Sequence, residues 1–362
     1  MRSRQSGLSL VELMVAVVIG LVGILAMTQA YLTSDRFNRS TTGEGSAQTG
    51  GLIALYQMER DLRMSGYGIA NATALGCGTL DWYYNPSYSA TIQSGSALPV
   101  LRLAPVTITT NGTNPDSVSV MFSTASERLL PTLVTSFNAA ATEVTADGVY
   151  GFKSGDMIVL ANSTGTTRCT MVKITDVQSG PQKLVFAPGA SVPYNPVAWG
   201  SFPTAYASGD LILNLGNPVI RTYSINNNKL SVTDSLLQVA GAVPLDIVDS
   251  IVDLRAQYGL DNGAASGTAN DGRVDEYSNV TPTTTAGWQQ VLSIRMGVLA
   301  RIGVFEKPTS GSDCDATTTA RTWSGGTFTK LDVTTTTSED RCYRYRVFET
   351  TIPLRNMIWR AS

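Results

Sequence analysis

One acidic side chain stands inside the most apolar stretch of the chain. Glu12 follows a basic head that contains Arg2 and Arg4, and the 22 residues from Leu13 to Ser34 carry no charge. A carboxylate at the centre of a bilayer costs roughly 2.5–3.5 kcal/mol on insertion scales, so such residues are usually paired and functional. The chemistry that we expect of Glu12 is charge pairing with a partner. The alternative is a side chain that snorkels to the membrane surface.

An acidic, glycine-containing loop holds the second group of chemically capable residues. Calcium takes about six to eight oxygen ligands, mostly carboxylates and carbonyls on tight turns. The loop does not follow the spacing of an EF-hand, and a solvated turn closed by side-chain hydrogen bonds is the alternative. Calcium is the one cofactor that the sequence suggests, and its oxygens would come from Asp261, Asn270, Asp271, Asp275 and Glu276.

Four cysteines form the third group. None lies in a Cys-x-x-Cys pair, so a structural zinc site is not expected. An even number in an exported chain predicts up to two disulfides, and four cysteines allow three pairings. We prefer Cys314–Cys342, because it would close a short, threonine-rich segment, and this leaves Cys77–Cys169. Buried free thiols are the alternative.

The composition argues against catalysis and against nucleic-acid binding. The chain has 362 residues and no histidine, which removes Ser-His-Asp and Cys-His catalysis and imidazole-bound zinc. The net charge of −2 gives no basic excess that could neutralise phosphates. Charged residues make up 15% of the chain, and polar uncharged residues replace them, as is usual in extracellular β-rich domains. We therefore do not expect an enzyme.

The elements that would position Glu12 begin with a long helix. An uncharged run of this length matches the hydrocarbon core of a bilayer, about 30 Å thick. Arg2 and Arg4 should keep the N-terminus in the cytoplasm and place the remainder outside. Residues 34–51 contain Gly43, Gly45, Gly50 and Gly51, so we expect the helix to be interrupted or frayed there.

A second helical segment and a β-rich remainder follow. Leu52, Leu55, Tyr56, Glu59 and Leu62 recur at helical spacing, and Gly66 is a plausible stop. Short strands separated by turn-rich loops follow, which is typical of antiparallel β folds. We predict an α+β fold with strands at 117–122, 156–161, 169–177, 183–186, 210–215, 218–225, 229–233, 251–258, 291–301 and 343–352.

The N-terminus resembles the class III signal of type IV prepilins. A glycine, an apolar residue and a glutamate five positions after the glycine precede the apolar run, as Gly7, Leu8 and Glu12 do here. Leu8 replaces the usual Phe, and Ser9 the usual Thr. The resemblance implies cleavage after Gly7 by a prepilin peptidase and N-methylation of Leu8. It also implies that Glu12 pairs with the terminal amine of a neighbouring subunit, which could set subunit register.

Residues 60–67 resemble a segment of PilW-type pilins and of the related J-type pseudopilins of type II secretion. Weaker similarities to PilW-type chains lie at 155–160, 252–259, 288–295 and 346–356. The resemblance implies a pilin fold, with a long N-terminal helix packed on a large antiparallel β domain. The implied divisions are a leader (1–7), a transmembrane and filament-core helix (8–33), a linker with the second helical part (34–67), and a periplasmic β-rich domain (68–362).

The implied function is that of a minor pilin, assembled into the tip or priming complex of a type IV pilus. Implied partners are other minor pilins, the major pilin, a tip adhesin, the prepilin peptidase and the inner-membrane assembly platform. The protein would sit in the inner membrane with a periplasmic C-terminal domain and then move to the extracellular pilus. Roles in cell adhesion and twitching motility would follow.

Two other functions remain open at this point. A J-type pseudopilin of a type II secretion system would have a similar signal and early helix. An exported carbohydrate-binding or hydrolytic protein would carry an ordinary secretory signal, with cleavage near Ala30. The length of the apolar run and the presence of Glu12 argue against that signal.

Overall fold

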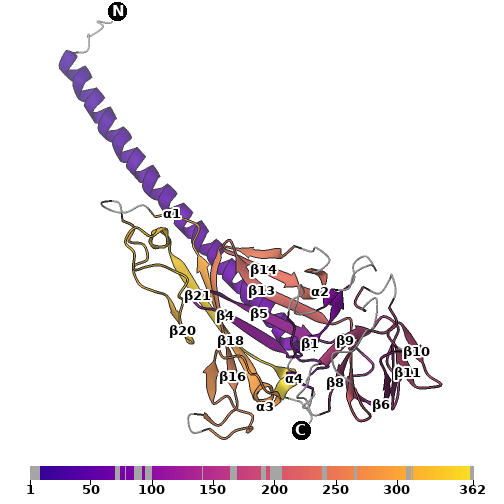
Figure 1. The fold of residues 1–362 in the computed structure, drawn as a ribbon. Helices are drawn as coiled ribbons and strands as arrows, with labels where there is room; N and C mark the ends of the chain where they lie inside the picture. Colours follow the sequence, from indigo (N-terminus) through magenta and orange to yellow (C-terminus); the bar gives the residue numbers. More distant parts are fainter. Residues whose placement is uncertain are drawn as a thin grey trace, which may run out of the picture.

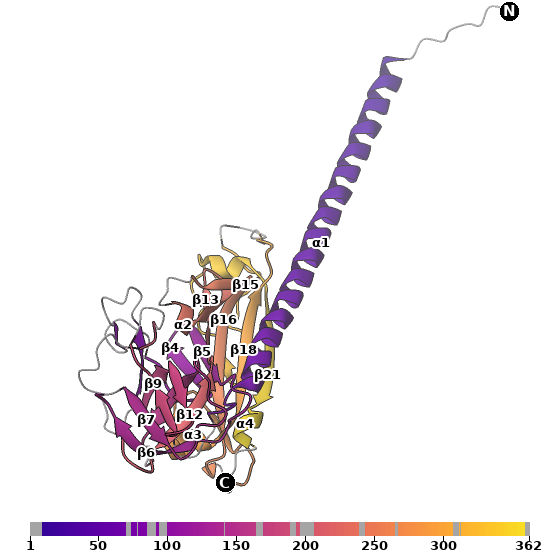
Figure 2. The ribbon, with the colours of Figure 1, turned by 90° about the vertical axis from the view of Figure 1, so that its right-hand side faces the viewer.

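The computed structural model describes residues 9–69, 74–77, 79–84, 92–93, 100–140, 142–163, 169–188, 193–195, 206–238, 243–264, 267–306, 311 and 313–358. A single long helix, α1 (Leu10–Met64), projects from a β-rich domain, and roughly its first half is free (Figures 1 and 2). Its second half packs on the domain. This arrangement confirms the α+β class and the long N-terminal helix.

Two sheets enclose the docked half of α1, and within the described residues their neighbouring strands all pair antiparallel. The four-stranded sheet has the order β17 (Glu276–Ser278), β16 (Ile251–Leu260), β18 (Val291–Arg301) and β21 (Tyr345–Pro353). The five-stranded sheet has the order β15 (Leu245–Asp249), β14 (Lys229–Asp234), β13 (Val219–Asn226), β5 (Asn114–Phe122) and β4 (Val106–Asn111).

A third, eight-stranded sheet lies at the end of the domain away from the free part of α1 (Figure 1). Most of it is inserted between β5 and β13, which are neighbours in the five-stranded sheet. Its order is β1 (Leu80–Asp81), β9 (Cys169–Lys173), β8 (Met157–Ala161), β12 (Leu211–Gly216), β6 (Thr132–Asn138), β7 (Glu143–Ala146), β11 (Lys183–Val185) and β10 (Asp176–Gln178). The β1–β9 pair is parallel.

Short elements complete the described structure. Two small hairpins are β2 (Tyr83–Tyr84) with β3 (Ile92–Gln93), and β19 (Thr322–Trp323) with β20 (Gly326–Thr327). The short helices are α2 (Ser235–Gln238), α3 (Thr285–Gln289), α4 (Arg355–Ile358) and a 3-10 helix at Glu339–Cys342. Asn227 and Asn228 adopt positive φ angles of 48° and 59° in the turn that joins β13 to β14, as expected of asparagine in a hairpin.

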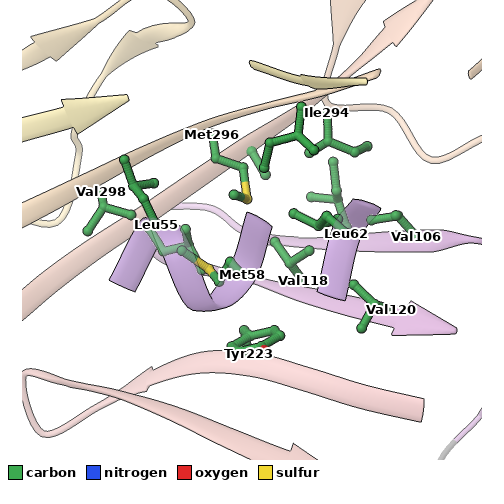
Figure 3. Packing of buried hydrophobic residues seen from close by; sticks show 14 of the residues in the cluster. Leu55, Met58, Leu62, Val106, Val118, Val120, Tyr223, Ile294, Met296 and Val298 are labelled. Carbon is green, nitrogen blue, oxygen red and sulfur yellow. The ribbon is translucent and has the colours of Figure 1, made fainter. Parts of the chain in front are cut away.

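The main core lies between α1 and the two sheets that enclose it. Leu55, Met58 and Leu62 of α1 face strand β18 on one side and strands β4, β5 and β13 on the other (Figure 3). Because all three side chains are buried, burial of each contributes about 1.5–3 kcal/mol toward fixing the helix on the domain. The direction of the free half therefore follows from how the second half is held.

The predicted interruption of the helix at residues 34–51 is wrong, because α1 runs unbroken through it. Three of the four glycines instead face the domain. A Cβ added at Gly43 would lie 3.0 Å from the Val304 side chain, and one at Gly50 would lie 3.1 Å from Val248. One at Gly51 would overlap the ring of Phe348. These glycines let the helix approach the sheets closely. The cost of about 1 kcal/mol for each glycine is offset by packing.

Candidate functional site

The free half of α1 carries Glu12, the assembly residue predicted from the sequence. Ser9 caps the helix by accepting a hydrogen bond from the Val11 amide at 3.3 Å. Glu12 is exposed on the first turn, where a negative charge is favoured by the helix dipole. Gly7 and Leu8 lie outside the described residues, so cleavage and methylation there stay predictions.

The free half is also the part of the molecule that fits a membrane. Its apolar side chains are exposed along the whole stretch, for example Val17, Ile24 and Leu32. The 22 uncharged residues from Leu13 to Ser34 rise about 33 Å as a helix, close to the thickness of a hydrocarbon core. Among the described residues, α1 is the one helix long and apolar enough to cross a membrane.

A buried charge cluster holds the second half of α1 on the five-stranded sheet. Asp61 is 3% exposed, and its carboxylate accepts hydrogen bonds from Arg221 Nη1 at 2.9 Å and from Tyr223 Oη at 2.8 Å. Arg60 Nε also lies 3.4 Å from the same carboxylate. The hydrogen bond to Asp61 raises the pKa of Arg221, and burial raises the pKa of Tyr223. The guanidinium therefore stays charged beside the carboxylate.

Sequence reasoning assigned no role to this cluster, although a signal was present. Asp61 lies three residues after Met58 and next to Leu62, so it shares a helix face with an apolar pair at i, i+4 spacing. The stripe predicted through Leu52, Tyr56 and Glu59 lies on another side of the helix. A carboxylate on such a face requires partners, because an unpaired buried charge is costly. The identity of the partners depends on β13, which is distant in the sequence.

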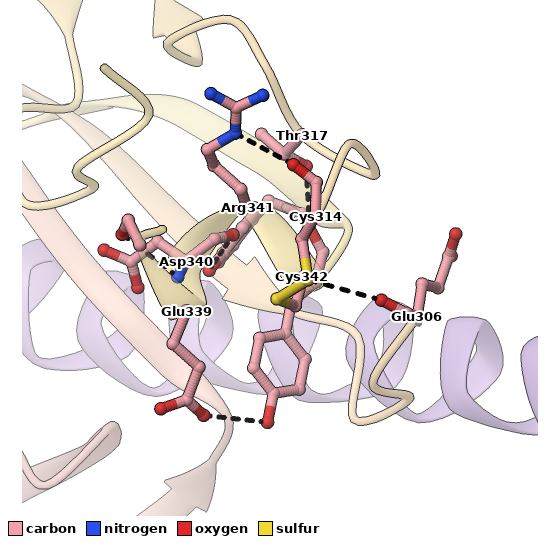
Figure 4. Close-up of a disulfide and its surroundings, with 10 residues drawn as sticks. Glu306, Cys314, Thr317, Glu339, Asp340, Arg341 and Cys342 are labelled. Carbon is pink, nitrogen blue, oxygen red and sulfur yellow. Dashed lines mark hydrogen bonds between the residues drawn. A yellow bond between two sulfur atoms is a disulfide. The ribbon is translucent and has the colours of Figure 1, made fainter. Parts of the chain in front are cut away.

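The long connection from β18 to β21, residues 302–344, is closed by a disulfide (Figure 4). Cys314 and Cys342 are bonded, and their neighbours tie the segment down further. Arg341 Nε donates to the Cys314 carbonyl at 2.9 Å, and Thr317 Oγ1 donates to the Tyr343 carbonyl at 2.6 Å. This connection covers one face of β16 and β18. Its Phe328, Leu331 and Val333 form a small apolar cluster with the strand residues Val252, Leu299 and Tyr345.

The second disulfide joins the start of the domain to the eight-stranded sheet. Cys77 bonds to Cys169 at the beginning of β9, and the two Cα atoms are 6.1 Å apart. Leu80 pairs with the same residue in the β1–β9 ladder. Both preferred pairings are thus present, and the described residues contain no free cysteine.

The acidic loop uses its predicted calcium ligands in hydrogen bonds within the loop. Asp261 accepts from the Asp271 and Gly272 amides at 3.2 and 2.8 Å. Asp275 accepts from the Gly263 amide at 2.6 Å, and Asn262 donates to Glu276 at 2.7 Å. Asn270 has a φ of 63°, as turn asparagines often do. In the described part of the chain, which lacks 265–266 of this loop, no cluster of three metal-ligating residues forms. Calcium binding stays a prediction.

A stem that is apolar and exposed, continuous with a helix buried on an antiparallel β domain, is the arrangement of a pilin fold. Comparison with protein families agrees. Residues 2–28 match the prokaryotic N-terminal methylation motif, and residues 220–356 match the type IV pilus-assembly protein W family, PilW. The two matches support a PilW-type minor pilin of the type IV pilus, and a pilin anchored in a membrane. No curated protein and no solved structure matched the chain.

The two family matches include some of the segments for which the sequence predicted a resemblance and leave out others. The N-terminal signal lies in the first match, and the segments at 252–259, 288–295 and 346–356 lie in the second, which covers β13 to the start of α4. Residues 60–67 and 155–160 lie outside both. The eight-stranded sheet also lies outside both matches. The matched family assembles pili and is not a family of enzymes.

Proposed function

We propose that the protein is a minor pilin of the tip or priming complex that starts a type IV pilus. The observation that carries the proposal is the unbroken α1, which joins a membrane-length apolar stem with Glu12 to a docked β domain. After cleavage behind Gly7, the stem would leave the inner membrane and enter the helical core of the filament. Glu12 would then pair with the amine of a neighbouring subunit, and the β domain would face the outside.

The shape of the domain supports a place at the end of the filament. The eight-stranded sheet extends the domain at the end away from the stem (Figures 1 and 2). A subunit within the shaft has neighbours above and below its domain, whereas a subunit at the tip has none above. An enlarged distal end is therefore tolerated best at the tip. Partners there would be other minor pilins, the major pilin and a tip adhesin.

The mature N-terminus tests the proposal. Mass spectrometry of the native protein should find N-methyl-Leu8 as the first residue. A chain that begins after Ala30 would support an ordinary secreted protein, and a chain that begins at Met1 would contradict processing altogether. Methylated Leu8 is shared by J-type pseudopilins, so a second measurement is needed. Immunogold labelling should place the protein at the ends of sheared pili, whereas a pseudopilin would be absent from them.

A further inference from the structure

A notch opens where α1 leaves the β domain. Its volume is about 630 Å³, and it lies between about two and a half turns of α1, from Asn38 to Ala47, and the segment that follows β18. Among the described residues that line it, the charged ones are both arginines, Arg39 and Arg301, and none is acidic. The remaining polar lining includes Thr42 and Ser46. The lining itself is therefore cationic, although Asp35 pairs with Arg39 from one turn earlier in α1.

Arg301 is held in the wall of the notch. Its Cζ lies 4.3 Å from the centre of the Tyr343 ring, which fixes the guanidinium by a cation–π contact. Its Nε is buried and has no hydrogen-bond acceptor among the described residues. Buried donors normally have an acceptor. Arg39 stands on the opposite wall, 72% exposed, with its Nε 2.9 Å from Asp35. The buried Nε of Arg301 and the Asp35-paired Nε of Arg39 do not face a ligand, but a guanidinium has five N–H donors, so the terminal Nη groups of both arginines can bind an anion.

The stem gives the height of the notch above a membrane. If the 22 uncharged residues through Ser34 span the hydrocarbon core, Asn38 lies about 6 Å beyond its edge, given a rise of about 1.5 Å per residue. The polar headgroup layer of one leaflet is roughly 5–8 Å thick. Phe37 and Phe305 are exposed beside the notch, where large apolar side chains can insert at the headgroup boundary. The end of the notch at Asn38 and Arg39 thus lies at the level of the outer-leaflet phosphates, and the end at Ala47 lies beyond them.

We infer that the notch binds the phosphate of an anionic phospholipid from the outer leaflet of the inner membrane. Arginine binds phosphate with paired N–H groups, and two guanidinium groups disfavour a zwitterionic head that carries its own cation. The bound lipid would hold the β domain at a fixed height and tilt until the stem is withdrawn. The inference rests on the proposed function, because it requires the membrane-anchored state that precedes assembly.

Lipid retention by the full-length protein tests the inference. The protein is purified in a nonionic detergent, incubated with dioleoyl phosphatidylglycerol or dioleoyl phosphatidylcholine, and examined by native mass spectrometry. We expect phosphatidylglycerol to be retained in preference to phosphatidylcholine. Arg39→Gln and Arg301→Gln should each weaken retention about tenfold, the loss typical of one charge-assisted hydrogen bond. The control is Arg355→Gln, an exposed arginine in α4 at the other end of the domain, which should retain lipid as the unmodified protein does.

Three results would overturn the inference. Equal retention of phosphatidylglycerol by all variants would exclude the notch as the site that binds the lipid. Equal retention of both lipids would exclude recognition of the anionic head. Displacement of the lipid by millimolar inorganic phosphate would assign the notch to a free anion. If Arg301→Gln fails to fold, Arg39→Gln still tests the notch, because Arg39 is a solvent-facing helix residue whose replacement should leave the fold intact. N-methyl-Leu8 in the same preparation shows whether the pilin proposal stands independently.

Discussion

Asp61 on α1 and Arg221 on β13 are 160 positions apart in the sequence, and their side chains form a 2.9 Å ion pair at the base of the helix. Tyr223 adds a second donor to the same carboxylate. Apolar packing alone permits small rotations of a helix on a sheet, whereas a charged pair with a third hydrogen-bond partner fixes one register. The pair therefore sets the direction in which the stem leaves the domain.

Replacing Asp61 by Ala should lower the stability of the domain by roughly 2–3 kcal/mol. The reason is that Arg221 and Tyr223 would remain partly buried without their acceptor. Thermal unfolding of the full chain in detergent, followed by near-ultraviolet circular dichroism, would measure the loss. Asp249→Ala is the matched control, since Asp249 forms an ion pair with Lys229 but its side chain is 78% exposed. It should change stability by less than about 0.5 kcal/mol. Equal losses of stability in the two variants would show that the buried ion pair stabilises the domain no more than the exposed one does.

The two glycines at positions 45 and 51 should respond oppositely to alanine. Gly45 has no atom within 4 Å of an added Cβ, so Gly45→Ala should stabilise the helix by up to about 1 kcal/mol. At Gly51 the added Cβ overlaps the Phe348 ring, so Gly51→Ala should cost roughly 1–3 kcal/mol through overpacking. Unfolding curves of the two single variants, measured together, provide the comparison. Stabilisation by both would mean that α1 does not dock as closely as described.

The same glycines show why part of the fold could not be predicted from the sequence. Helix propensity depends on the residue itself, so four glycines in an 18-residue stretch indicate a break. Whether each glycine is a defect or a place of close approach depends on what lies opposite. Val304, Val248 and Phe348 lie opposite, and all three are more than 190 positions away in the sequence. Only the tertiary structure reveals that relationship.

The strands were predictable where their pattern was local. The ten predicted ranges correspond to β5, β8, β11 to β14, β16, β18 and β21, with 169–177 splitting into β9 and β10. The prediction missed β4, β6, β7 and β15, and also the two- and three-residue strands β1, β2, β3, β17, β19 and β20. In β6 the inward and outward positions are not separated by residue type, because Thr132 is buried while Leu133 is exposed. The stripe predicted for α1 is right at Leu55 and Leu62 but wrong at Leu52 and Tyr56, which are exposed. The buried face instead includes Met58, because the position of the sheets, and not apolar spacing alone, decides which side of the helix is covered.

Asp253 should give the domain a stability that falls as pH rises between about 4 and 6. Its carboxylate is buried beside Arg255, whose Nε lies 3.0 Å away, and burial raises the pKa of Asp253 from 3.8 to about 6. Within that window the folded protein holds a proton that the unfolded chain has released, so ionisation costs stability on the order of 2–3 kcal/mol. Above the window the cost is constant.

The comparison with Asp253→Asn isolates this carboxylate from the others. Both proteins are unfolded thermally at several pH values between 4 and 7. The variant should gain stability relative to the unmodified protein as pH rises from 4 to 6, and the difference should then level off. If the ion pair with Arg255 outweighed burial, the difference would have the opposite sign, and the raised pKa would be refuted.

The stability of the acidic loop should depend on the Asp261 carboxylate whether or not calcium is present. Asp261 is 3% exposed and accepts from two backbone amides, so Asp261→Ala should cost roughly 1–3 kcal/mol. We expect the same loss in a chelator and in millimolar calcium, because the carboxylate is occupied by the loop itself. Asp249→Ala, which removes an exposed carboxylate of β15 outside the loop, serves as the control. A calcium-dependent rise in the melting temperature that Asp261→Ala abolishes would instead establish the metal site.

Glu12→Ala should leave membrane insertion intact and impair entry into pili. Removing a carboxylate from an apolar stem lowers the cost of insertion, so the membrane fraction should contain normal amounts of the protein. In the filament, however, the amine of the neighbouring subunit would lose its counter-charge, and an uncompensated buried charge costs about 3–5 kcal/mol. Immunoblots of membranes and of sheared pili, together with pilus counts, measure both effects. Thr28→Ala is the matched control, because Thr28 is an uncharged polar residue of the same exposed stem whose hydroxyl bonds to the Ile24 carbonyl. Normal pilus number with normal content of the Glu12 variant would show that the carboxylate takes no part in assembly.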